Sequence, residues 1–152
     1  MTITRQEKWD QRFLDVARLI ATWSKDESTQ VGSVIVDSRN TMVSAGYNGF
    51  PRGVNDDVPS RHERPAKRSY FEHAERNAIY QNQGQSLVGC RIYVTHTPCA
   101  DCARAIIQVQ IAEVIVDKSG GVGSDWYAAR HTDGYDASLE MFYETGVIYR
   151  EV

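Results

Sequence analysis

The stretch RIYVTHTPCADCARAIIQVQIAEVIV, at residues 91–116, decides the fold of this chain. It opens with a β-rich run at residues 91–95 and closes with residues 114–116, which are typical of a buried strand. Between them we expect a helix from Pro98 to about Gln110, because proline is tolerated in the first turn of a helix, where its missing N–H would have no partner. Strand, helix and strand in this order are typical of an α/β sheet covered by helices.

The rest of the chain adds elements on both sides of this stretch. Apolar residues three and four apart predict helices, and short β-branched runs predict strands. Residues 46–67 have neither pattern and many turn-forming residues, which predicts a long surface loop of a kind that is often functional. Together the elements predict an α/β fold in three α/β/α layers, with a mixed sheet of about five strands. Helices are expected at residues 6–23, 70–82 and 137–145, and strands at residues 31–36, 41–45 and 147–149.

Length and composition limit the classes of protein to which the chain can belong. With 152 residues and 41% hydrophobic composition, residues 1–152 are expected to form one domain with one core. Seventeen Lys and Arg against twenty Asp and Glu leave a net charge of −3, which gives no support for binding a nucleic-acid backbone. The N-terminus lacks the apolar segment of a signal peptide, and no stretch is long enough to span a membrane. We therefore expect a soluble, cytoplasmic protein without membrane or nucleic-acid partners.

Two short motifs carry the candidate chemistry, His73-Ala-Glu75 and Pro98-Cys-Ala-Asp-Cys102, each at the start of a predicted helix. A Cys-x-x-Cys pair at a helix start presents two thiolates to one metal ion, and an odd total of three cysteines fits poorly with a disulfide framework. His73, Cys99 and Cys102 are therefore expected to hold a catalytic zinc ion, which keeps a fourth position for water. Glu75 lies two residues from His73, so it is expected to transfer protons instead of binding the metal.

This pair of motifs resembles the His-x-Glu and Pro-Cys-x-x-Cys signature of the zinc-dependent cytidine and deoxycytidylate deaminases. The resemblance extends from the first predicted helix to Val116. It implies a cytidine-deaminase-like fold and a hydrolytic deamination, in which zinc lowers the pKa of its bound water to about 7 and the hydroxide attacks the carbon that carries the amino group. Glu75 would take the proton and pass it to the ring nitrogen and then to the departing ammonia.

Two further segments resemble the deoxycytidylate (dCMP) deaminase branch of that family: TQVGSVIV at residues 29–36, and GYNGFPRG at residues 46–53, followed by Asp56 and Asp57. The resemblance implies that dCMP is converted to dUMP for thymidylate synthesis, and that Asn48 contacts the nucleotide. It also implies a homo-hexamer activated by dCTP and inhibited by dTTP, with Mg²⁺ accompanying the triphosphate effector. The implied allosteric region comprises Asn48, Gly49, Arg52 and Asp57.

The sequence offers weaker signals for the other residues expected to contact the substrate. The segment at residues 25–29 resembles the family's segment before the first strand, so Lys25, Ser28 and Thr29 are expected to bind substrate, and the same carry-over adds Ala74. Tyr127, with its neighbour Trp126, is expected either to stack on the base or to pack in the interior. A 5'-phosphate needs positive charge nearby, and the sequence does not choose among the candidates. These are Lys25, Arg52, Arg61, Arg64, Lys67 and Arg68.

The remaining cysteine and histidines are expected to have ordinary roles. Cys90 is predicted to be a small buried apolar residue. His96 and His131 are predicted to be ordinary polar residues, with a role beside the metal ligands open for His96. Because the first 89 residues contain no cysteine, a second, structural zinc site built on thiolates is not expected.

Several other interpretations stay open. A tRNA adenosine deaminase uses the same two motifs, although the acidic net charge and the loop at residues 47–49 count against it. A cytidine deaminase acting on free nucleosides usually has Cys where this chain has His73. A catalytically silent nucleotide-binding module would retain zinc only for stability, and the intact Glu75 argues against it. A redox role for the Cys-x-x-Cys pair would leave His73 and Glu75 without a purpose.

Overall fold

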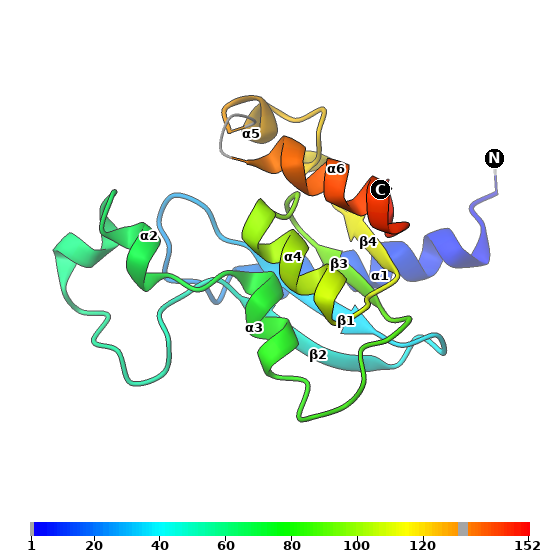
Figure 1. The fold of residues 1–152 in the computed structure, drawn as a ribbon, viewed down its shortest axis with the longest axis horizontal. Helices are drawn as coiled ribbons and strands as arrows, with labels where there is room; N and C mark the ends of the chain where they lie inside the picture. Colours follow the sequence, from blue (N-terminus) through cyan, green and yellow to red (C-terminus); the bar gives the residue numbers. More distant parts are fainter. Residues whose placement is uncertain (1, 131–133) are drawn as a thin grey trace.

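A computed structural model describes residues 2–130 and 134–152 of the chain, so His131 lies outside the described residues. Figure 1 shows the arrangement of the elements, and every helix and strand predicted from the sequence is present with shifted ends. None of the helices in these two ranges has the length and apolar character that a membrane span requires. The elements follow in the order α1 (Arg5–Ala21), β1 (Gly32–Val36), β2 (Met42–Tyr47), η1 (Pro59–His62), α2 (Lys67–Tyr70), α3 (Ala74–Tyr80), β3 (Arg91–Val94), α4 (Ala100–Gln108), β4 (Glu113–Val116), η2 (Lys118–Gly120), α5 (Asp125–Ala128), α6 (Tyr135–Thr145) and β5 (Ile148–Glu151).

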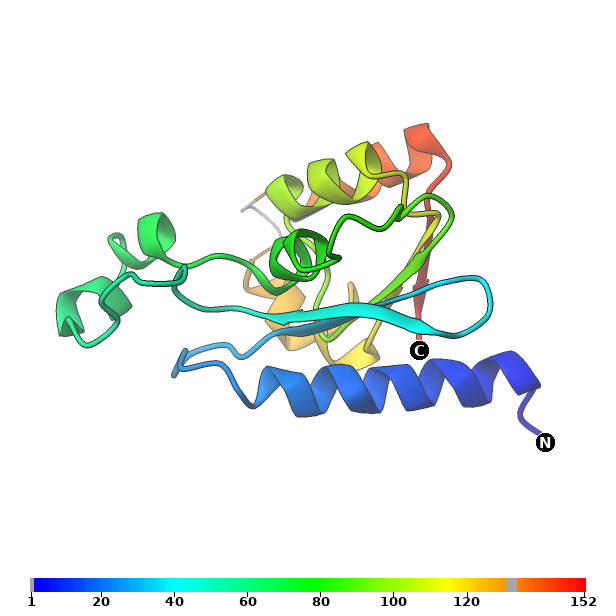
Figure 2. The ribbon, with the colours of Figure 1, turned by 90° about the horizontal axis from the view of Figure 1, so that it is seen from below.

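The five strands form one mixed sheet in the order β2-β1-β3-β4-β5. Strand β1 pairs antiparallel with both β2 and β3, whereas β3, β4 and β5 run parallel to one another. Helix α1 covers one face of the sheet, and α3, α4 and α6 cover the other (Figure 2). The predicted α/β/α fold with a five-stranded mixed sheet is therefore confirmed.

The central strands are buried on both faces, so their side chains alternate between two cores. In β1, Val34 and Val36 pack against α1, whereas Ile35 points into the core on the other side. Strand β3 shows the same alternation, with Tyr93 facing α1 and its neighbours facing α3 and α4. Cys90 is 5% exposed and lies in the second core, as predicted for a small apolar residue.

Two glycines let helices lie directly on the sheet. A Cβ atom at Gly32 would come within 2.0 Å of the backbone oxygen of Ala17 in α1. A Cβ atom at Gly46 would come within 2.4 Å of the backbone oxygen of Ala74 and of the backbone nitrogen of Ala78, both in α3. A larger residue at either position would therefore have to move a helix.

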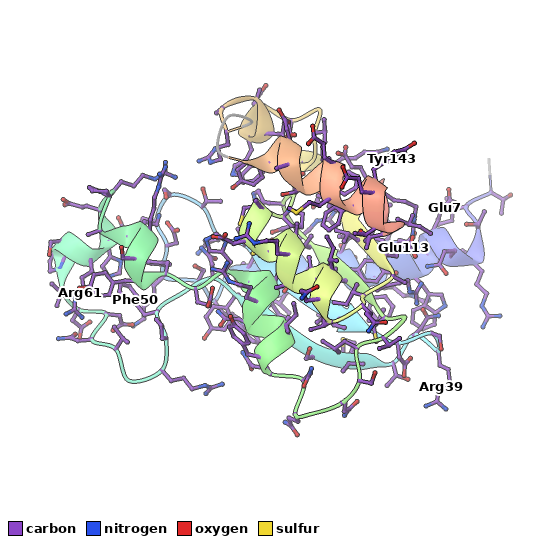
Figure 3. All side chains as sticks on the ribbon, in the orientation of Figure 1. Glu7, Arg39, Phe50, Arg61, Glu113 and Tyr143 are labelled. Atoms are coloured by element: carbon purple, nitrogen blue, oxygen red, sulfur yellow. The ribbon has the colours of Figure 1, made fainter. Side chains whose placement is uncertain are left out.

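Residues 50–71 form an arm that extends away from the sheet; Figure 1 shows its helix α2, and Figure 3 labels Phe50 and Arg61 on it. The composition predicts a long loop in this region, but the arm contains the two short helices η1 and α2. The Phe50 ring lies 5.0 Å from the ring of His62 and 4.6 Å from that of Phe71. These ring contacts form a small aromatic cluster inside the arm, which the sequence pattern does not reveal.

Some helix boundaries differ from the prediction because the residues before them are extended or left-handed. Helix α3 begins at Ala74 instead of residue 70, since Glu72 pairs with Gly49 and His73 has extended backbone angles. Helix α4 begins after Cys99, which is also extended, so Pro98 precedes the helix instead of lying in its first turn. The unpredicted helix α5 is capped by the Ser124 hydroxyl, which accepts the backbone N–H of Tyr127.

A buried carboxylate on α1 accepts hydrogen bonds from residues of β3 and β5. Asp10 is fully buried and accepts hydrogen bonds from Tyr93 Oη at 2.7 Å, Gln6 Nε2 at 2.8 Å and Arg150 Nη1 at 2.9 Å. Burial alone would raise the pKa of Asp10, but the bonds from Arg150, Gln6 and Tyr93 outweigh it and hold that pKa below its ordinary value. The ionised carboxylate is therefore part of the folded state.

Replacing Asp10 by alanine is expected to lower the free energy of unfolding by about 3 kcal/mol, because it leaves the buried Tyr93 hydroxyl without its acceptor and removes one of the two carboxylates that pair with Arg150. Replacing Asp15, whose ion pair with Arg18 is exposed, should cost less than about 1 kcal/mol. Because the folded-state pKa of Asp10 is lowered, its contribution is complete above the unfolded value of about 3.9 and is lost as the pH falls through the folded one. Urea unfolding between pH 3 and 7 measures both effects, and equal losses for the two variants would contradict the prediction.

Candidate active site and metal centre

Three donor atoms from the two sequence motifs converge at the starts of α3 and α4. His73 Nδ1 lies 3.4 Å from Cys99 Sγ and 3.4 Å from Cys102 Sγ. His73 directly precedes α3, Cys99 directly precedes α4, and Cys102 lies in the first turn of α4. The donor atoms all lie within 4.8 Å of one another, which is close enough to hold a single metal ion.

Hydrogen bonds to the sheet place His73 and Glu75. The Ser33 hydroxyl of β1 donates to the Ala74 carbonyl at 2.8 Å, and the Ser44 hydroxyl of β2 donates to the Ala78 carbonyl at 2.7 Å. Together with the close approach at Gly46, these bonds fix α3 against β1 and β2. The start of α3, and with it the imidazole of His73, is held by the sheet.

The electrostatics of the two thiols suit a cation. The hydrogen bond from Cys102 lowers the pKa of Cys99 to about 4, against the effect of burial and with a smaller contribution from His73. The same hydrogen bond, together with burial, raises the pKa of Cys102, so Cys99 is the sulfur that loses its proton more readily. One imidazole nitrogen and two thiol sulfurs match the ligand types that zinc prefers, and three protein ligands are typical of a catalytic zinc site.

Glu75 lies beside this centre without joining it. Its side chain is 4% exposed, and Glu75 Oε2 lies 3.5 Å from Cys102 Sγ. Burial raises the pKa of the Glu75 carboxyl, although the charge of His73 opposes the change. A raised pKa makes a carboxylate a better proton acceptor, which suits a group that takes up a proton and then passes it on.

A cavity of about 400 Å³ opens over the centre. Its walls come from the segment before β1, the C-terminal end of the arm, the two motifs, and residues of α5, Arg130 and the start of α6. Of the predicted substrate-binding residues, Ser28, Thr29, Asn48 and Ala74 line it. Among the basic candidates it contains Arg64, Lys67 and Arg68. It also contains residues that sequence reasoning missed, among them Asp26, Arg130 and Tyr135.

Asn48 is 8% exposed and braces the cavity rim through its own side chain. Its Oδ1 accepts the backbone N–H of Val31 at 2.8 Å, and its Nδ2 donates to the Thr29 carbonyl at 2.9 Å. Asn48 therefore ties the end of β2 to the segment that leads into β1. A side chain with both a donor and an acceptor is needed for this pair of bonds.

Two other predicted substrate contacts lie elsewhere. Lys25 is not part of the cavity wall, because its ammonium group pairs with Asp56 of the arm at 2.6 Å. Tyr127 is 6% exposed and donates its hydroxyl to Asp136 at 2.6 Å, which is a packing role. Its neighbour Trp126 lines the cavity instead and lies 4.6 Å, between ring centroids, from His96.

The three remaining residues of the predicted allosteric region also lie outside the cavity. Gly49 pairs with Glu72 through two backbone hydrogen bonds, at 3.0 and 2.7 Å. Arg52 and Asp57 are exposed on the arm. Any effector that contacts Arg52 and Asp57 would therefore bind at a surface separate from the metal centre.

Arg130 has no sequence signal that could have found it. It follows α5 and reaches across the cavity to Thr29, with its Nη2 3.5 Å from Thr29 Oγ1, although 101 residues separate the two in the chain. Its guanidinium also lies over the Trp126 ring at 5.2 Å. Burial lowers the pKa of His96, which contacts the same Trp126 ring, to about 4, so its imidazole is neutral at pH 7. Arg130 therefore carries the positive charge beside this ring.

The comparisons with known proteins agree with this geometry. The family model for the cytidine and deoxycytidylate deaminase zinc-binding region matches residues 7–118. A Drosophila melanogaster protein named "Probable deoxycytidylate deaminase" is 44% identical, over 93% of this chain and 71% of its own. The Homo sapiens deoxycytidylate deaminase is 39% identical, over 95% of this chain and 79% of its own.

A comparison with solved structures points to the same family of folds. A crystal structure of the dCMP deaminase from cyanophage S-TIM5 in complex with dCMP and dUMP superposes with a TM-score of 0.75, over 99% of this chain and 100% of the other, at 22% identity. At that identity the likeness establishes the fold. With the family match over residues 7–118 and the donor set of His73, Cys99 and Cys102, the chain belongs to the zinc-dependent cytidine and deoxycytidylate deaminase family.

Proposed function

We propose that this protein is a deoxycytidylate deaminase, which hydrolyses dCMP to dUMP and ammonia and so supplies dUMP for thymidylate synthesis. The observation that carries the proposal is the meeting of a His/Cys/Cys donor set, a buried glutamate and an arginine-lined wall in one cavity. The relatives named deoxycytidylate deaminase, at 44% and 39% identity over more than nine-tenths of the chain, support the choice of substrate.

In this proposal His73, Cys99 and Cys102 hold one zinc ion, and Glu75 moves protons. When bound, zinc supplies the Lewis acidity that makes water a nucleophile near neutral pH. Glu75 Oε2 first moves a proton from the attacking water to N3 of the cytosine ring. It then moves a proton from the new hydroxyl at C4 to the amino group, which leaves as ammonia while a carbonyl forms. The burial of Glu75 keeps bulk solvent from exchanging these protons.

The 5'-phosphate is proposed to bind at Thr29 and Arg130. The Thr29 hydroxyl accepts from Arg130, so its own hydrogen is free to donate to a phosphate oxygen. Ser28 is less suitable, because its hydroxyl already donates to Asp26 at 2.9 Å. The arginine adds a charge-assisted bond of the kind that favours phosphate recognition.

Regulation and assembly are proposed from the family resemblance. The exposed arm residues Arg52 and Asp57, with Gly49 at its base, are the proposed sensing region for dCTP and dTTP, and Mg²⁺ would accompany the triphosphate. We also propose a homo-hexamer, which light scattering of the purified protein tests. Free thiols at all three cysteines suit a reducing compartment, so we propose that the enzyme works in the cytoplasm.

Product analysis with zinc-loaded protein tests the function. The protein is incubated with dCMP, deoxycytidine, CMP and a tRNA transcript together, and selective conversion of dCMP to dUMP is the expected result. Inosine in the tRNA with dCMP untouched would point to a tRNA adenosine deaminase, and no conversion at all would point to a silent nucleotide-binding module. Repeating the dCMP assay with dCTP or dTTP tests regulation, which predicts a shift of the saturation curve of about 5- to 150-fold in apparent affinity.

A further inference from the structure

The cavity wall contains a buried carboxylate that the proposed mechanism does not use. Asp26 is 6% exposed and lies in the segment between α1 and β1. Its Oδ1 accepts the backbone N–H of Ser28 at 2.8 Å, the Ser28 hydroxyl at 2.9 Å and the backbone N–H of Thr29 at 3.2 Å. Its Oδ2 accepts a longer bond from Asn48 Nδ2 at 3.3 Å. The carboxylate is thus the centre about which the Ser28–Thr29 turn is built.

The counter-ion of this carboxylate comes from the arm. Lys67, in the first position of α2, places its ammonium nitrogen 2.6 Å from both oxygens of Asp26 and 2.7 Å from Ser28 Oγ. The side chain of Lys67 is 13% exposed. An ammonium group has three N–H donors, and here three acceptors lie within hydrogen-bond distance.

We propose that Lys67 is a positioning residue that acts through Asp26: the ion pair locks the Ser28–Thr29 turn so that Thr29 faces the substrate. The inference rests on the proposed function, because Thr29 is there the hydroxyl that meets the phosphate. It assigns to one lysine of the arm a role in substrate binding without direct contact. It also makes the position of the arm a determinant of affinity.

A direct contact between Lys67 and the phosphate is the competing explanation, and the geometry disfavours it. Turning the ammonium group towards an anion would leave the buried Asp26 carboxylate without its cation, which is costly. Arg130 already supplies a guanidinium next to Thr29. Arg64 and Arg68, which also line the cavity, are exposed on the arm and can meet an anion without breaking a buried pair.

Steady-state kinetics with dCMP separates the two explanations. Lys67→Met and Asp26→Asn should each raise KM by about 10- to 100-fold and leave kcat nearly unchanged, since both misplace the same turn. Lys67→Arg should restore most of the affinity because it keeps the charge. The double variant should lose no more than either single one, as expected for residues that act as a unit. Lys25→Met is the matched control, since it removes an exposed ion pair between the same two segments and should leave KM unchanged.

Two kinetic results would overturn the inference. If Lys67→Met raises KM but Asp26→Asn does not, Lys67 meets the phosphate directly, because freeing the lysine would then preserve binding. If neither variant changes KM, the pair has no role in substrate binding. Asparagine at position 26 keeps the shape of the carboxylate, so this variant serves if Lys67→Met fails to fold.

Hydrogen exchange tests the positioning independently of any activity. The amide hydrogens of Ser28 and Thr29 donate to Asp26, so their exchange should accelerate at least about tenfold in Lys67→Met, while Lys25→Met leaves them unchanged. Unchanged exchange in Lys67→Met would refute the positioning role. If the wild-type protein does not deaminate dCMP at all, the proposed function fails, and the exchange rates still decide whether Lys67 orders the turn.

Discussion

Replacing Glu75 by glutamine is expected to lower kcat for dCMP by about 10²- to 10⁴-fold while zinc remains bound. Glutamine keeps the size and hydrogen-bonding shape of the side chain but cannot take up a proton from water. Because the three proposed ligands are unchanged, the zinc content per protomer should stay at the wild-type value. Initial rates of ammonia release and elemental analysis of the same sample measure the two quantities.

The control makes the same chemical change at Glu144, which is exposed on α6. This variant should have wild-type kcat and zinc content. Turnover of Glu75→Gln at the wild-type rate would exclude Glu75 as the proton carrier. A fall in kcat accompanied by loss of zinc would mean that the carboxylate supports the metal instead.

Replacing Cys102 by alanine is expected to remove both zinc and turnover. Cys102 is fully buried and its sulfur lies 3.4 Å from His73 Nδ1, so alanine leaves two ligands, fewer than a zinc site requires. The wild-type protein should also lose stability on treatment with a chelator, by about 4 kcal/mol if zinc is present at a thousand times its dissociation constant. Calorimetric melting with and without chelator should show a large shift for the wild type and none for the variant.

Cys90 provides the matched cysteine control. It is also buried but lies in the core on the α3 and α4 side of the sheet and is not part of the donor set. Cys90→Ala should keep its zinc, its activity and its response to chelator, at the cost of a small loss in stability for the missing sulfur. If Cys102→Ala still binds one zinc ion tightly, the proposed ligand set is wrong.

The sheet and the metal centre were predictable because their signals are local. Short β-branched runs mark strands such as β1, and the spacing of Cys99 and Cys102 places two sulfurs on one turn of a helix. The helix starts were less accurate, since the extended backbone at His73 depends on the pairing of Glu72 with Gly49 far back in the chain. A pattern within one segment does not contain such a contact.

The substrate wall was harder to predict because it is assembled from distant segments. Lys25 was favoured for its place in a family-like segment, yet its ammonium group pairs with Asp56. Lys67 meets the neighbouring carboxylate of Asp26 instead, across 41 residues of sequence. Arg130 likewise reaches Thr29 only through the fold. Nothing in the composition distinguishes these basic residues from the solvated ones on the surface.

Because β2 and α3 approach each other closely at Gly46, the catalytic rate should depend on a residue that has no side chain. A methyl group at Gly46 would collide with the Ala74 carbonyl, and Ala74 lies between His73 and Glu75 in the chain. Lifting that helix by about 1 Å is a displacement that can cost a hundredfold in rate when it reaches reacting groups. Position 46 should therefore tolerate as few substitutions as the metal ligands do, and even alanine there should lower the rate in the way that a substitution in the active site does.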